Sequence, residues 1–280
     1  MTVLLLTIVE TSKFELRLSR QSTIHYITNA KNFSNLQLMP FSKANIMAQL
    51  QKEILPLQGN KHIAGVHDFD AGLNLIKHAF TNASFPLGAI HEFFCNGAED
   101  VSATGGFISG ILSAIMQTGG VSIWISSSRM VFPPALKSFG IEPEKIIFIT
   151  LQKEKEIFWA LEESLRCEGV AAVIAETTGM SFTASRRLQL AVEQSRVTGF
   201  IIRQNPVNLA TACVTRWKVT HLPIIAHDDL PGLGYPRWNI ELLKVRNGTP
   251  GNWQLEWAAG RFRHSYKLAS INLEKQRKAG

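Results

Sequence analysis

The stretch EFFCNGAEDVSATGGF, from Glu92 to Phe107, decides the fold that we expect for this chain. Its first residues complete an apolar, strand-like segment that begins at Ile90. Small and acidic residues follow Gly97, and a helical pattern takes over near Gly106. A strand, a glycine-bearing loop and a helix in this order are the arrangement with which α/β proteins cradle phosphate groups. We therefore expect an α/β fold organised around this junction.

Apolar strands alternate with helical patterns along the rest of the chain. The predicted strands are Val121–Ser126, Ile146–Leu151, Val170–Ala175 and Phe200–Arg203, and the predicted helices begin at Pro133, Lys153 and Thr183. Near-continuous apolar strands separated by helices indicate a mostly parallel sheet that is flanked by helices on both faces. After Val207 the pattern changes, and two strand-like segments, 237–246 and 252–257, flank the turn NGTPGN. We predict that they form an antiparallel hairpin extending the same sheet.

Composition and charge divide the chain into three parts. Of its 280 residues 45% are hydrophobic and 18% charged, which is typical of globular proteins. The formal charge of +7 arises at the two ends, since the middle of the chain is nearly neutral. We interpret residues 1–46 as a poorly ordered extension, or as a segment upstream of the natural start. Residues 47–260 are interpreted as the main domain and residues 261–280 as a basic tail.

Cysteine usage and hydropathy indicate a cytoplasmic protein. The three cysteines, Cys95, Cys167 and Cys213, show no C-x-x-C spacing, so we expect reduced thiols. The longest apolar run near the start, Val3–Val9, is too short to span a bilayer. No residues have the spacing of a metal site, and His227-Asp228-Asp229 is too local for three ligands to converge.

The junction lacks the groups that hold a nucleoside triphosphate. In a phosphate loop, G-x-x-x-x-G-K-[ST], a lysine neutralises the terminal phosphates and a hydroxyl binds Mg²⁺. Here seven residues separate Gly97 from Gly105, and neither the lysine nor the hydroxyl residue follows. Glu99 and Asp100 add negative charge, and two like charges ~4 Å apart repel by about 4 kcal/mol at an effective dielectric near 20. We therefore expect no Mg-ATP, no ATP hydrolysis and no cofactor.

Any residual nucleotide site would consist of the few groups that remain around the junction. A carboxylate ends the strand VAAVIAE, where a metal-binding acid would be expected, but no water-activating acid follows VSIWIS. That carboxylate is either a residual metal ligand or, as we favour, a surface residue at a strand end. The candidate residues of this degenerate site are Gly97, Ser102, Thr104, Gly105 and Glu176.

Two sets of segments resemble known families. FDAGLNLIKHAFTNASFPLGAIHEFF (69–94), the junction, and the alternating strands and helices of 121–176 resemble the RecA core in their order and spacing. FTASRRLQLAVEQSRVTGFIIRQ (182–204) and TACVTRWKV (211–219) are similar to the ImuA family, closest to the form in Bacteroidetes-type bacteria. The resemblance covers roughly 47–260. ImuA proteins are RecA-like accessory proteins of bacterial error-prone translesion synthesis.

The resemblance implies a component of the SOS response to DNA damage that works through partners. The implied partners are an ImuB-like Y-family polymerase homologue, RecA and a C-family error-prone polymerase complex, and DNA is a further candidate. We therefore expect a non-catalytic accessory factor. Two alternatives stay open: a cell-division inhibitor like the related SulA, and a RecA-like DNA-dependent ATPase with an unusual loop.

Basic side chains in three segments are candidates for contact with a partner or with DNA. One pair lies near the start of a helix, a second lies at strand ends where RecA-like proteins place nucleotide-sensing and DNA-facing loops, and a third group lies in the aromatic-containing tail. Solvated faces and an inert loop are the alternatives, and the implied partners favour protein over DNA. These candidates are Arg186, Arg187, Arg203, Arg216, Arg261, Arg263 and Lys267.

Overall fold

The computed structural model describes residues 71–264, apart from residues 74, 118, 129–130, 207–209 and 225–233. The predicted extension over 1–46, the acidic loop at His227 and the end of the basic tail, including Lys267, lie outside this part of the chain. Among the described helices, none combines the length and the apolar character needed to cross a lipid bilayer.

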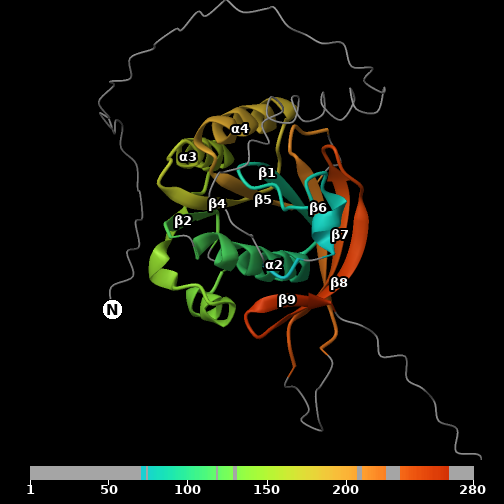
Figure 1. Ribbon diagram of the computed structural model, residues 1–280. Helices are drawn as coiled ribbons and strands as arrows, with labels where there is room; N and C mark the ends of the chain where they lie inside the picture. The colour runs from blue at the N-terminus through green and yellow to red at the C-terminus, as the bar shows by residue number, and fades with distance from the viewer. Residues whose placement is uncertain are drawn as a thin grey trace, which may run out of the picture. The chain divides into compact units, whose positions relative to one another are not determined.

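A nine-stranded sheet organises the described residues, with the strand order β3-β2-β4-β5-β1-β6-β7-β8-β9 (Figure 1). The strands from β3 to β6 in this order pair in parallel, and β7, β8 and β9 continue the sheet with antiparallel pairings. The predicted α/β sheet with an antiparallel C-terminal extension is therefore confirmed. The strands are β1 Ile90–Cys95, β2 Val121–Ser126, β3 Ile146–Thr150, β4 Val170–Thr177, β5 Thr198–Gln204, β6 Thr215–Leu222, β7 Arg237–Val245, β8 Gly251–Ala258 and β9 Arg261–His264.

Helices cover both faces of the parallel part (Figure 1). Successive side chains of a strand point to opposite faces, so each central strand supplies two cores. In β5, Phe200 and Ile202 join the core beneath α2, whereas Ile201 joins the core beneath α3 and α4. The helices are α2 Ala98–Met116, α3 Glu154–Leu165 and α4 Phe182–Ser195, with short 3₁₀ helices η1 Ile76–Ala79, η2 Pro133–Phe139 and η3 Pro143–Lys145.

The C-terminal strands β6 to β9 pack their inner face against α2. Trp217, Trp238, Trp257 and Phe262 supply large buried side chains to the core that contains α2. The helix makes room with glycine: a Cβ on Gly110 would overlap the ring of Phe262. Trp217, Trp238 and Trp257 are therefore core residues.

Two strands were not predicted. β6 was not assigned as a strand, and Arg261–His264, which we assigned to the basic tail, instead form β9 against β8. In β9 the alternation of buried and exposed side chains covers only three residues: Phe262 is 2% exposed, while Arg261 and Arg263 on either side of it are exposed. One apolar residue between two arginines gives too little periodicity to indicate a strand, so its assignment depends on the neighbouring strand.

Candidate functional site

The junction between β1 and α2 is much tighter than its sequence suggested. Only Asn96 and Gly97 separate the strand from the helix, which begins at Ala98 and not near Gly106. The predicted loop was wrong, because Ser102, Thr104 and Gly105 all lie within α2. Between β1 and α2 the chain therefore has no open loop whose backbone N–H groups could wrap around phosphate groups.

The acidic residues of this segment explain why the helix starts where it does. Glu99 and Asp100 occupy the first turn, where negative charge interacts favourably with the helix dipole. The backbone N–H of Asn96 donates to Asp100 Oδ2 at 3.0 Å, and Val101 N–H donates to the Gly97 carbonyl at 3.1 Å. The end of the helix that could attract an anion thus already carries two carboxylates.

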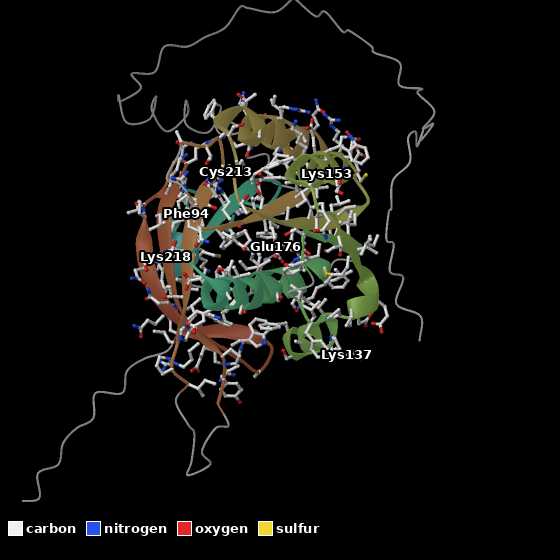
Figure 2. All side chains as sticks on the ribbon, turned by 180° about the vertical axis from the view of Figure 1, so that it is seen from behind. Phe94, Lys137, Lys153, Glu176, Cys213 and Lys218 are labelled. Carbon is white, nitrogen blue, oxygen red and sulfur yellow. The ribbon has the colours of Figure 1, made fainter. Side chains whose placement is uncertain are left out.

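A buried ion-pair network joins the central strands on the opposite face of the sheet. Glu92 on β1 accepts from Arg203 Nη1 on β5 at 2.6 Å and from Arg216 Nε on β6 at 2.8 Å. Thr211 donates its hydroxyl to the same carboxylate at 2.9 Å. Both guanidinium groups also lie over the Phe94 ring, 5.4 and 4.6 Å from its centroid. Figure 2 labels Phe94 beside the strands concerned.

This network corrects the expected role of two arginines. Arg203 is 1% exposed and Arg216 is buried as well, so neither presents its side chain for contact with DNA or a partner protein. Their sequence positions at strand ends concealed this, because the acid that pairs with them lies on a different strand. The available signal was Glu92 itself, a charged residue inside a mostly apolar strand.

Glu176 is also buried, although we favoured a surface position for it. It is 3% exposed, and Trp124 donates its indole N–H to Glu176 Oε1 at 2.8 Å. Among the described residues Oε2 has no hydrogen-bond partner. Burial raises the pKa of this carboxyl group, and the bond from Trp124 opposes the increase.

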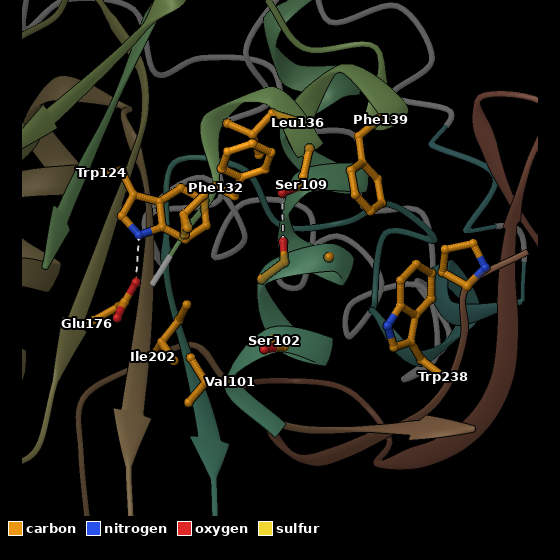
Figure 3. A pocket seen from close by; sticks show the side chains of 15 residues that line it. Val101, Ser102, Ser109, Trp124, Phe132, Leu136, Phe139, Glu176, Ile202 and Trp238 are labelled. Carbon is orange, nitrogen blue, oxygen red and sulfur yellow. Dashed lines mark hydrogen bonds between the residues drawn. The ribbon is translucent and has the colours of Figure 1, made fainter. Parts of the chain in front are cut away.

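A pocket of about 340 Å³ lies beside Glu176, between α2, η2 and the sheet (Figure 3). Of the described residues that line it, only Glu176 is ionisable, and most of the others are apolar or aromatic. On the helix side, Gly105 and Gly106 contribute no side chains, and Val101, Ser102 and Ser109 of α2 complete the lining. The aromatic lining residues are Trp124, Phe132, Phe139 and Trp238.

Comparison with curated proteins places the chain in a family. Protein ImuA of Caulobacter vibrioides, in strains NA1000 and CB 15, is 32% identical over 209 residues, covering 70% of this chain and 86% of the relative. The chain belongs to the ImuA family. A crystal structure of the RadB recombinase matches the fold with a TM-score of 0.51 and 12% identity, covering 71% of this chain and all of RadB. The RecA-like fold is thus confirmed, while no family model matches.

The surface arginines of this ImuA-family chain are arranged differently from the buried pair. Arg187 on α4 bridges to Glu162 on α3 at 2.5 Å, and its neighbour Arg186 is exposed. Arg261 and Arg263 are exposed on β9. All four lie on the surface, and their roles in contact remain predictions.

Metal binding finds no support among the side chains of the described ranges. Within them, no three His, Cys, Asp or Glu residues are grouped closely enough to hold an ion.

Thr104, which we included in the degenerate nucleotide site, is fully buried, and its hydroxyl lies 3.3 Å from Cys95 Sγ. Ser102 and Gly105 instead line the pocket beside Glu176.

Proposed function

We propose that this chain is a non-catalytic accessory factor in SOS-induced, error-prone DNA repair. Its membership of the ImuA family supports the role in mutagenesis. The observation that carries the non-catalytic part is the β1–α2 junction. Two residues and an acidic helix start occupy the place where a triphosphate would need an open loop and a lysine.

We propose that the chain acts through protein partners, namely an ImuB-like Y-family polymerase homologue, RecA and a C-family error-prone polymerase. A scaffold without catalytic groups acts through its surfaces, and exposed arginines suit carboxylate-bearing partners. Arg186 lies on α4 and Arg261 and Arg263 lie on β9, so two separate surfaces of the sheet domain carry such groups. Direct binding of DNA phosphates by the same side chains is the second candidate.

Damage-induced mutation frequency in the host tests the role. Deletion of the gene should abolish the ultraviolet-induced rise in drug-resistant mutants, and the intact chain should restore it. The double variant Arg261→Glu/Arg263→Glu should restore the mutation frequency poorly. The control is Lys137→Glu, a single charge reversal at an exposed position on η2, which should restore it like the intact chain. An unchanged mutation frequency in the deletion strain would contradict the proposal. Filamentous cells on overexpression would indicate a cell-division inhibitor instead.

A further inference from the structure

We propose that the pocket beside Glu176 receives an arginine side chain from a protein partner. This inference rests on the proposed function in one respect only, which is that the guanidinium group comes from a protein. The pocket, its single carboxylate and its aromatic walls are features of the structure itself (Figure 3).

The first step concerns the carboxylate. Glu176 Oε1 is engaged by the Trp124 indole, whereas Oε2 is buried without a hydrogen-bond donor among the described residues. An unsatisfied buried acceptor is costly, and a donor that enters the pocket would remove that cost. Burial raises the pKa of the carboxyl group, so an incoming cation would also favour its ionised form.

The second step concerns the walls. Phe132, Phe139 and Trp238 surround the space with aromatic rings, and a guanidinium group stacks on such faces while it donates hydrogen bonds in its own plane. The chain already uses this combination internally. Glu92 and the Phe94 ring hold two guanidinium groups, those of Arg203 and Arg216. Glu176 presents the same chemistry with no described arginine or lysine lining the pocket.

The third step separates an arginine from a nucleobase, which also stacks and donates N–H groups. A nucleotide brings a phosphate, and no described cation lines the pocket to meet it. Among the described residues the one ionisable group that lines the pocket is an acid, which favours a cation over a phosphate, so the observations favour arginine.

The fourth step concerns space and entry. A Cβ built on Gly105 meets only the Trp124 ring, at 4.0 Å, so this position leaves room inside the pocket. Phe132 is 69% exposed, so its ring forms a solvent-facing wall of the pocket. Since neighbouring atoms cover Glu176 Oε2, the carboxyl group must turn toward the ligand when the guanidinium group enters.

Nuclear magnetic resonance of the ¹⁵N-labelled full chain tests the proposal. The indole N–H of Trp124, assigned with Trp124→Phe, reports on the bond to Glu176. N-acetyl-L-arginine amide should shift this signal saturably, with a dissociation constant on the order of 1–10 mM. The citrulline analogue has nearly the same shape without the charge, and it should bind at least about tenfold more weakly.

Two variants separate the carboxylate from the space. Glu176→Gln should weaken arginine binding at least about tenfold, because the charge is lost while the shape is kept. Gly105→Leu should block the pocket with Glu176 intact, which keeps the test valid if the first variant does not fold. Glu163→Gln, at an exposed position on α3, is the matched control and should bind like the parent chain.

Three results would overturn the proposal. They are the absence of a saturable shift, equal binding of arginine and citrulline, and unchanged binding in the Gly105→Leu chain. A saturable shift with deoxycytidine monophosphate but not with arginine would identify a nucleotide site instead. This measurement does not depend on the mutagenesis assay, so failure of either one is distinguishable from failure of the other.

Discussion

The Glu92 carboxylate pairs with two guanidinium groups inside the sheet, and its removal would take one buried negative charge from both cations. We expect Glu92→Gln to lower the free energy of unfolding by about 3–5 kcal/mol, the range found when one partner of a buried ion pair is removed. The amide keeps the shape of the side chain, so the loss would reflect charge more than packing. Urea unfolding followed by circular dichroism measures it.

Glu163→Gln is the comparison for this variant. Glu163 pairs with Arg166 on the surface of α3, where solvent screens the interaction. Its substitution should change the free energy of unfolding by less than about 1 kcal/mol. A loss of similar size in the two variants would show that the buried network contributes no more than a surface pair.

Single residues also show what the sequence could and could not predict of the site. Arg203 and Arg216 were identified as notable from their positions, but Glu92 precedes them by 111 and 124 residues, and only the strand order brings the three together. Glu176 was correctly placed near a strand end. Its hydrogen-bond donor is Trp124, a residue of β2 that no local pattern connects to it.

His91 makes stability depend on pH. The imidazole is stacked between Phe85 and Phe200, and its nitrogens lie 2.7 Å from Thr215 Oγ1 and 2.9 Å from the Pro86 carbonyl. Burial lowers its pKa from 6.5 to about 3. Between these values the unfolded chain binds a proton that the folded chain does not, so stability falls as the pH drops from 6.5 toward 3.

The size of this effect follows from the shift. From pH 7 to pH 5, protonation of His91 in the unfolded chain should cost about 2 kcal/mol of stability. His91→Gln cannot take up the proton and should lose about that much less over the same interval, whatever its stability at pH 7. Urea unfolding of both chains at the two pH values measures the difference. Equal losses would contradict the assignment to His91.

At the scale of elements, the glycines of α2 have opposite roles. A Cβ on Gly110 would overlap the Phe262 ring, whereas one on Gly105 meets only the Trp124 ring at van der Waals distance. Gly110→Ala should therefore destabilise the protein by about 1–3 kcal/mol through overpacking. Gly105→Ala should stabilise it by about 0.5–1 kcal/mol, because alanine favours a helix more than glycine does. Thermal unfolding of the two variants would refute this if both changed stability in the same direction.

Two adjacent glycines of α2 explain why its start was predicted at the wrong residue. Gly105 and Gly106 look like the end of a loop, but both lie within α2, and a Cβ on Gly106 would come within 3.0 Å of the Trp238 ring. Tertiary packing overrides their low helix propensity. The strands β1 to β5 were predictable because burial on both faces makes each one a nearly continuous apolar run, whereas β6 was not assigned. β9 was not, since its single inward residue has meaning only beside β8.

For the whole molecule, the strand order places β1 and α2 where a RecA-like fold would hold a nucleotide, and the question is whether one binds. A ligand that binds only the folded chain stabilises it by about 2.7 kcal/mol at a hundred times its dissociation constant. With two residues in the junction, Glu99 and Asp100 at the helix start and no lysine, we expect no such gain. Millimolar Mg-ATP should therefore leave the unfolding temperature unchanged.

Magnesium chloride with inorganic phosphate is the control for ionic strength and nonspecific anion binding. Glu176→Gln extends the test: the carboxylate is turned toward Trp124, so its loss should change the response to Mg-ATP no more than Glu163→Gln does. A saturable, magnesium-dependent rise in the unfolding temperature that Glu176→Gln removes would mean that a functional nucleotide site survives. In that case the chain would act through ATP as well as through its surfaces.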